Sequence, residues 1–175
     1  MNFNNLLAGK TVFITGGSRG LGRALCVECA RQGAQIAFIY SNDTEGAHET
    51  EKEIKSRRQE VCAMQASVTD SLGLSLAVKQ VETRLGPIDI LINNAGISQP
   101  FPLALTDEAD WDQVVDVNLK GQFLTLRQVI PGMMRRRGGV ILNIGSLAGL
   151  RLIEAPVHYS ASKAGSDHLV RAWHR

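Results

Sequence analysis

The chain has 175 residues, of which 44% are hydrophobic and 21% are charged. This length and composition predict one globular domain, spanning 1–175, with a sizeable core. The formal net charge of +2 is too small to indicate nucleic acid or an anionic membrane as a partner. Because the sequence has neither a secretory signal nor an apolar run long enough to span a bilayer, we predict a cytoplasmic protein.

The alternation of β-rich and amphipathic segments predicts an α/β fold with a doubly wound parallel sheet of the Rossmann type. The first strand breaks into glycines, and apolar residues then recur at helical spacing. Pro131 should bend or interrupt the longest helical segment. Five strands are expected, at 11–15, 35–40, 60–66, 88–93 and 140–144, with helices at 21–31, 45–59, 71–85, about 106–137 and from about 158 onward.

The glycine-rich turn after the first strand predicts a phosphate site. A helix N-terminus that follows a buried strand presents unpaired N–H groups and the positive end of a dipole, and glycines let a phosphate approach the backbone. The spacing Gly16-x-x-x-Gly20-x-Gly22 differs from the commoner G-x-G-x-x-G. A tight turn needs glycines in any case, so the turn alone leaves a purely structural role open.

The end of the second expected strand bears on the choice between two nicotinamide dinucleotides. An acidic residue there would accept hydrogen bonds from the ribose 2′-OH, whereas this chain reads Tyr40-Ser41-Asn42, with Asp43 one step further. Hydroxyl and amide groups leave room for a 2′-phosphate, and Arg19 in the turn is placed to pair with it. We therefore expect NADPH in preference to NADH. In the alternative, Arg19 is a solvated loop residue and Asp43 takes the 2′-OH.

Tyr159 and Lys163 predict proton-transfer chemistry near the end of the sequence. Side chains at i and i+4 share one face of a helix, and an ammonium beside a phenol favours the ionised phenol. Such a phenol can give a proton to a carbonyl or take one from an alcohol. Pairs at this spacing are common in helices, so the prediction depends on which other motifs occur in the same sequence.

Five segments occur together and in order: Thr15-Gly16-x-x-x-Gly20-x-Gly22, Asn93-Asn94-Ala95-Gly96, Asn118, Ser146 and Tyr159-x-x-x-Lys163. In these segments the chain closely resembles the short-chain dehydrogenase/reductase family, most nearly its 3-oxoacyl-[acyl-carrier-protein] reductase type of member. The resemblance runs from Ala8 to about Ala172. It implies that 1–175 is a dinucleotide-binding domain that also carries the catalytic residues.

The resemblance implies a role for each catalytic candidate. Tyr159 would be the general acid in ketone reduction, and Ser146 would hold the substrate oxygen. Lys163 would bind the nicotinamide ribose and favour the ionised form of Tyr159. Asn118 would interrupt its helix and hold a water that links Lys163 to solvent. Taken singly, each has a plain alternative: a serine that caps the fifth strand, a surface asparagine, a half-buried tyrosine.

The resemblance also implies where a nicotinamide dinucleotide would lie. The stretch 94–96 would line the adenosine ribose and steady the central strands. Where the family usually has an acidic residue to accept from the adenine amino group, this chain has Ser67, which can still hydrogen-bond. The residues expected to contact the cofactor are Gly16, Ser18, Arg19, Gly20, Leu21, Gly22, Tyr40, Ser41, Asn42, Ser67, Val68, Asn94, Ala95, Gly96, Tyr159 and Lys163.

Cysteines and histidines give no indication of a metal. Cys26 and Cys29 are spaced as C-x-x-C, but no second pair follows at zinc-site spacing, and the four histidines lack a motif such as H-E-x-x-H. We expect free thiols on a packed helix and no metal site.

The family pattern continues beyond the tyrosine–lysine helix, through a sixth strand, a Pro-Gly turn, a substrate-covering segment and a seventh strand. This sequence lacks them, so we expect a C-terminally truncated chain whose fifth strand exposes apolar surface. Two functions are then open. One is NADPH-dependent reduction of a ketone, such as a 3-oxoacyl thioester, to a secondary alcohol. The other is that of a non-catalytic dinucleotide-binding or assembly subunit.

Partners are expected to be a small carbonyl or alcohol substrate and further copies of the chain. The long helices 106–137 and 158–175 would join a homodimer or homotetramer. The segments 97–105 and 147–157 should line part of the substrate pocket, and both are fairly apolar. The sequence leaves the identity of the substrate open.

Overall fold

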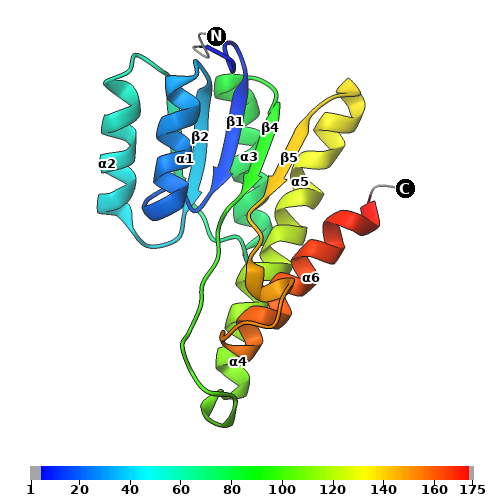
Figure 1. Ribbon diagram of the computed structural model, residues 1–175. Helices are drawn as coiled ribbons and strands as arrows, with labels where there is room; N and C mark the ends of the chain where they lie inside the picture. Colours follow the sequence, from blue (N-terminus) through cyan, green and yellow to red (C-terminus); the bar gives the residue numbers. More distant parts are fainter. Residues whose placement is uncertain (1–4, 174–175) are drawn as a thin grey trace.

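The computed structural model describes residues 5–173, which form a parallel sheet between two layers of helices (Figure 1). The strands are β1 (Thr11–Thr15), β2 (Gln35–Tyr40), β3 (Val61–Gln65), β4 (Ile90–Asn93) and β5 (Val140–Asn143). Their order in the sheet is β3-β2-β1-β4-β5, and every neighbouring pair is parallel. The predicted doubly wound sheet is therefore confirmed. The last three strands are shorter than the expected 60–66, 88–93 and 140–144 by one or two residues.

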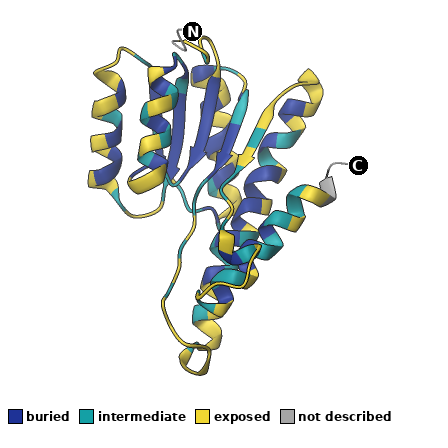
Figure 2. Cartoon of the chain, viewed as in Figure 1, coloured by how far each residue is buried: buried dark blue, intermediate teal, exposed yellow. Residues whose placement is uncertain are grey.

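Two apolar clusters cover the two faces of the sheet. Side chains alternate along β1, so that Val12 and Ile14 pack with α1 (Gly20–Arg31) and α2 (Thr44–Lys55). Phe13 points to the other face, where α3 (Ser71–Leu85) and α5 (Gly121–Arg136) cover it. Figure 2 shows the central strands buried and β5 largely exposed at the edge of the described sheet.

The second helix is shorter than the predicted 45–59. It begins at Thr44 and ends at Lys55. Arg58 then adopts a left-handed backbone, with φ of 60°. A left-handed residue cannot continue a right-handed helix, so the polar pattern through Gln59 overestimated its length.

The helical stretch expected at 106–137 is present, and it contains a π-helical turn at Asn118, where the resemblance implies an interruption. α4 (Glu108–Val115) leads into a five-residue turn of π-helix, Asp116–Lys120, before α5 begins. The interruption that Pro131 was expected to cause is absent: Pro131 lies inside α5. Pro131 and Arg127, four residues earlier, are both exposed, so the carbonyl that loses its partner can be hydrated.

The last described helix, α6, runs Val157–Trp173 and packs against α4, the π-helical turn and a short 3-10 turn, η3 (Leu147–Gly149). No helix within residues 5–173 has both the length and the apolar character needed to cross a bilayer.

Candidate functional site

A groove of about 720 Å³ lies at the carboxyl ends of the central strands. β1 has β2 on one side and β4 on the other, so the connections that follow β1 and β4 run to opposite faces of the sheet. A crevice is left between these two connections. The groove brings together all the predicted cofactor contacts except Tyr159 and Lys163. Its lining includes Gly16, Ser18, Arg19, Gly20, Leu21, Gly22, Tyr40, Ser41, Asn42, Ser67, Val68, Asn94, Ala95 and Gly96.

The glycine-rich turn depends on glycine at defined positions. Gly16 and Gly20 have φ of 73° and 55°, in the left-handed region that favours glycine. A Cβ on Gly22 would lie 1.9 Å from the backbone oxygen of Gly16. The first turn of α1 is therefore packed directly onto the strand end, which brings its N–H groups to the groove wall.

The end of β4 is tied to the same turn by backbone and amide hydrogen bonds. Asn94 Nδ2 donates to the carbonyls of Thr15 and Gly16 at 2.9 and 3.1 Å. The N–H groups of Asn94 and Ala95 donate to Thr15 Oγ1, each at 3.0 Å. These bonds hold the two walls of the groove together and steady the central strands.

Asp43 and Arg19 differ in whether their side chains have partners in the protein. Asp43 caps α2, where its Oδ1 accepts from the Gly46 N–H at 3.0 Å. Arg19 is exposed and lines the groove without a side-chain partner among the described residues. The Asp43 carboxylate thus caps α2 through one oxygen and also lines the groove, while the Arg19 guanidinium is free to meet an anion.

Ser67 directs its hydroxyl into its own turn. Its Oγ lies 2.8 Å from Thr69 Oγ1 and accepts from the Thr69 N–H at 3.2 Å. The residue lines the groove but already has polar partners, so it can offer only part of its hydrogen-bonding capacity to a ligand.

Lys163 connects α6 to the end of the sheet. Its Nζ donates to the carbonyl of Ile144 at 2.8 Å and lies 5.9 Å from the centroid of the Tyr159 ring. A Cβ on Gly96 would lie 3.7 Å from the same Nζ. Gly96 belongs to the groove, so Lys163 stands where the groove meets the helix that carries Tyr159.

Asn118 fastens the loop after β4 to α6. Its Oδ1 accepts from the Ile97 N–H at 2.8 Å, and its Nδ2 donates to Ile97 O and Ser162 Oγ at 2.9 and 3.0 Å. The residue is buried in the π-helical turn, at the place where the resemblance implies an interrupted helix. It is not a surface residue; its Nδ2 donates to two protein acceptors, while its Oδ1 accepts one hydrogen bond and can accept another.

A small cavity of about 10 Å³ adjoins Asn118 and Lys163. Thr15, Asn93, Gln122 and Thr125 also line it, and Asn93 Oδ1 and Gln122 Nε2 are buried there without a partner among the described residues. One acceptor and one donor facing a space of this size match the requirements of a single water.

Ser146 lies at the start of η3, which packs against α6 beside Lys163. Its Oγ accepts from the Ala148 N–H at 3.1 Å, and a Cβ on Gly149 would lie 2.7 Å from the carbonyl carbon of Lys163. Ser146 thus caps η3 and not the fifth strand, which ends at Asn143. The cap uses the oxygen as an acceptor and leaves the hydroxyl hydrogen available to a ligand. Tyr159 is half-buried.

Burial lowers the pKa of the Lys163 ammonium below its ordinary 10.5. Between that lowered value and 10.5 the unfolded chain holds more protons than the folded one, so stability contributed by this group rises with pH. We expect the free energy of unfolding of the wild type to increase relative to that of Lys163→Met as pH rises from neutral to about 10. Urea unfolding measures this, with exposed Lys79→Met as the control. A difference that does not change with pH would contradict it.

The two cysteines of the C-x-x-C spacing lie on α1, and Cys26 is buried. Burial raises the pKa of both the Cys26 and Cys29 thiols, which makes them poor nucleophiles and poor metal ligands. Within residues 5–173, no three acidic, histidine or cysteine side chains are grouped as a metal site.

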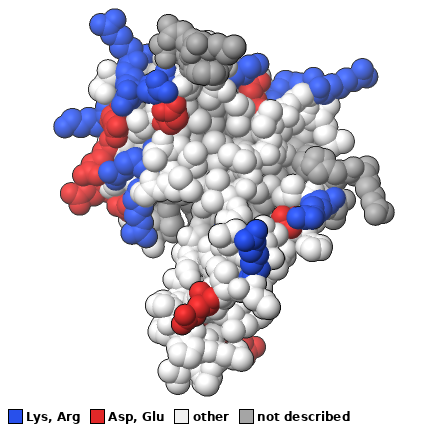
Figure 3. All heavy atoms as spheres, viewed as in Figure 1, with Lys and Arg blue, Asp and Glu red and all other residues white. Residues whose placement is uncertain are grey.

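The two apolar segments expected to line a substrate pocket do meet. Pro100, Phe101, Pro102 and Leu103 face Glu154, Ala155, Pro156 and Val157 across a hollow of about 520 Å³. Val157 begins the helix that carries Tyr159. Figure 3 shows few charged side chains on the part of the molecule that projects below the sheet, where these segments lie. Charged side chains gather instead over the helices beside the sheet.

Sequence reasoning missed several groove residues. Gln113 and Val117 reach the groove from α4 and the π-helical turn. Their contribution depends on how α4 packs against the loop after β4, and no local pattern in the sequence signals it. Ile39 and Ala66 follow from being the neighbours of predicted contacts.

Comparison with known proteins agrees with this geometry. Residues 10–175 match the sequence profile of the family described as short chain dehydrogenase. The chain belongs to this family. It is 36% identical over 163 residues to the 3-oxoacyl-[acyl-carrier-protein] reductase FabG of Staphylococcus aureus, which covers 93% of this chain and 66% of that protein. The resemblance predicted from the five segments is confirmed.

Solved structures of the family superpose closely on the chain. Levodione reductase matches with a TM-score of 0.90 at 33% identity, over 95% of this chain and 65% of that one. Carveol dehydrogenase from Mycobacterium avium, in complex with NAD, matches with a TM-score of 0.90 at 30% identity, over 97% and 66%. The chain thus spans just under two thirds of the length of such relatives.

Proposed function

We propose that this chain is an NADPH-dependent oxidoreductase that reduces a ketone to a secondary alcohol. The observation that carries the proposal is the place of Lys163, whose Nζ lies beside Gly96 of the groove and 5.9 Å from the centroid of the Tyr159 ring. A glycine-rich turn and a large groove thus lie next to a phenol–ammonium pair, an arrangement that suits reduction of a carbonyl by a bound dinucleotide. Family membership supports the same chemistry.

The residues of the chain would divide the work as follows. When bound, the dinucleotide supplies the hydride. Tyr159 gives its phenolic proton to the carbonyl oxygen, Ser146 donates a hydrogen bond to that oxygen, and the Lys163 ammonium favours the ionised phenol. Asn118 holds the loop at Ile97 against α6, and the cavity beside it has room for the water expected to carry protons toward Lys163.

We propose that the substrate is a ketone that carries an apolar group next to its carbonyl. The hollow between 100–103 and 154–157 is lined mainly by proline and hydrocarbon side chains, which suits an acyl chain. A relative named 3-oxoacyl-[acyl-carrier-protein] reductase supports a 3-oxoacyl thioester. We further propose a reducing compartment, the cytoplasm, because all three cysteines are free.

The test is to mix the purified chain with NADPH and a short 3-oxoacyl thioester and to follow NADPH absorbance. Oxidation that requires both the chain and the ketone supports the proposal. If NADPH binds but is not oxidised with any apolar ketone, the chain is instead a non-catalytic dinucleotide-binding subunit.

We propose that Arg19 gives NADPH its advantage over NADH. A charge-assisted hydrogen bond contributes about 1.5–3 kcal/mol, so Arg19→Gln should weaken NADPH binding about ten- to a hundredfold and leave NADH binding unchanged. Calorimetric titration measures both dissociation constants. Arg57→Gln is the control, at a site just beyond the C-terminal end of α2. The cofactor choice fails if the wild type binds NADH as tightly as NADPH.

Assembly into a homodimer or homotetramer is a second proposal, and exposed apolar side chains support it. Phe123 and Met134 on α5 are 46% and 67% exposed, and Val140 and Leu142 on β5 are 59% and 47% exposed. Surface of this kind is usually covered. Size-exclusion chromatography with light scattering tests it, and a monomer at micromolar concentration would reject it.

A further inference from the structure

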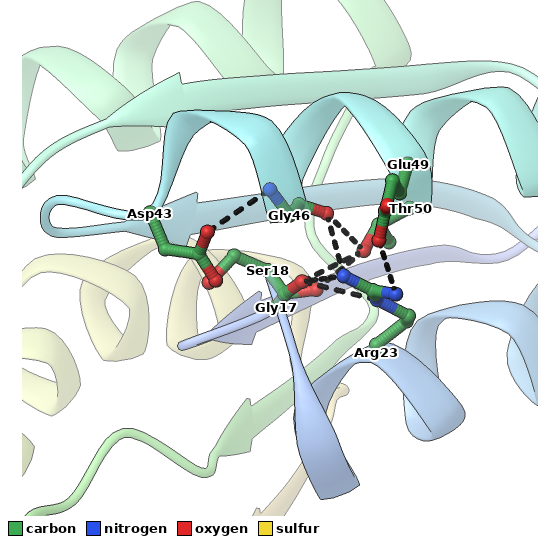
Figure 4. Close-up of polar contacts among 7 residues, drawn as sticks. All are labelled: Gly17, Ser18, Arg23, Asp43, Gly46, Glu49 and Thr50. Atoms are coloured by element: carbon green, nitrogen blue, oxygen red, sulfur yellow. Dashed lines mark hydrogen bonds and ion pairs between the residues drawn. The ribbon is translucent and has the colours of Figure 1, made fainter.

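The carbonyl groups of the glycine-rich turn are held by side chains from two helices (Figure 4). Thr50 Oγ1, on α2, lies 3.1 Å from Gly17 O and 3.3 Å from Ser18 O. Arg23, on α1, donates from Nε and Nη2 to Ser18 O at 3.0 and 2.7 Å. Thr50 is fully buried, so water cannot replace its hydroxyl as the partner of these carbonyls.

The same two side chains also join the turn to α2. Thr50 Oγ1 and Arg23 Nη2 reach Gly46 O at 3.0 and 3.2 Å, and Arg23 Nη1 pairs with Glu49 at 2.7 Å. Because a hydroxyl has one hydrogen, Thr50 shares its donation among the carbonyls of Gly17, Ser18 and Gly46. A Cβ on Gly46 would lie 2.7 Å from Ser18 O. The helix therefore packs directly onto the turn, and the hydrogen bonds are short because glycine permits that approach.

Fixing these carbonyls also fixes the N–H groups on the other side of each peptide plane. In a trans peptide the C=O and the following N–H point in opposite directions. Holding Gly17 O and Ser18 O toward α2 turns the N–H groups of Ser18 and Arg19 away from it. Both residues line the groove, and neither N–H donates to another described residue. Those of Gly16 and Gly17, in contrast, donate to Ile39 O.

We infer that Arg23 and Thr50 are positioning residues for phosphate binding in the groove. They hold back two carbonyl oxygens that would repel a phosphate and direct the N–H groups of Ser18 and Arg19 toward it. Neither side chain lines the groove. The inference rests on the proposed function, since it concerns how the turn binds the phosphates of NADPH.

Thr50→Val tests the inference, because valine keeps the shape of threonine and removes the hydroxyl. We expect the NADPH dissociation constant to rise about tenfold, as for one weakened charge-assisted hydrogen bond, with kcat at saturating NADPH unchanged. Thr50→Ser should restore binding to within about twofold of wild type. Thr11→Val is the matched control, since Thr11 is also buried, lines none of these cavities, and its hydroxyl donates to a helix carbonyl, Leu85 O, at 2.9 Å.

Equal NADPH affinity in Thr50→Val and Thr11→Val would overturn the inference while leaving the proposed function intact. If the wild type binds no NADPH, the proposed function fails, and amide chemical shifts of the ligand-free variants decide the geometry. The Ser18 and Arg19 N–H shifts should then move more in Thr50→Val than in Thr11→Val, and equal shifts overturn the inference. Should Thr50→Val not fold, Arg23→Lys takes its place, because a lysine cannot donate to Ser18 and Gly46 in the same forked geometry.

Discussion

Replacing Tyr159 with phenylalanine is expected to slow ketone reduction by about a hundred- to ten-thousandfold, the usual contribution of a general acid. The ring remains, so its packing and its position near Lys163 Nζ should be kept. NADPH affinity should fall less than about tenfold, since at most one hydrogen bond to the cofactor is lost. Steady-state rates and a separate binding titration distinguish the two effects.

Ser160→Ala, one residue further along α6, is the control for this experiment. Its hydroxyl has no place in the proposed chemistry, so rate and affinity should both match the wild type. A Tyr159→Phe protein that retains the wild-type rate would remove Tyr159 from the role of proton donor, whatever its effect on NADPH binding.

Gly22→Ala should cause the largest structural effect. The added methyl would lie 1.9 Å from Gly16 O, a backbone atom that cannot rotate away. Overpacking of this kind costs about 1–3 kcal/mol of unfolding free energy. Because relief requires the turn to leave the end of β1, NADPH binding should weaken about tenfold or more as N–H contacts are lost. Urea unfolding and calorimetric titration measure the two consequences.

Gly138→Ala is the matched control, because its nearest non-neighbouring atom lies 4.0 Å from the added methyl. It should change stability by less than about 0.5 kcal/mol and leave NADPH binding unaltered. Were Gly22→Ala to bind NADPH as well as Gly138→Ala, the close packing of turn and strand would have no part in cofactor binding.

The elements that sequence reasoning placed well are those with a strong local signal. The apolar runs at 11–15 and 35–40 coincide with β1 and β2, because strands covered on both faces have no other pattern. In the helical stretch at 106–137, the interruption expected from Pro131, a local signal, is absent, whereas the interruption at Asn118 was expected only from the family resemblance. Asn118 holds the π-helical turn through Ile97 and Ser162, which no periodicity reveals.

The candidate site was predictable in its members and not in its connections. Glycines, Asn118, Ser146, Tyr159 and Lys163 were found from ordered motifs. The position of Asp43 after β2 did not indicate that it caps α2. Arg23 and Thr50 lie outside the five ordered motifs. Their roles follow from the packing of α2 against the turn, which only the three-dimensional arrangement gives.

The most direct test of hydride transfer in this crevice uses NADPH that carries two deuterium atoms at nicotinamide C4. The chain is incubated with this NADPH and a 3-oxoacyl thioester, and the alcohol is analysed by mass spectrometry. Our account predicts an alcohol with one deuterium at the carbinol carbon from the wild type, and almost none of this product from Tyr159→Phe. Wild-type protein that binds the labelled NADPH but yields no deuterated alcohol would contradict it.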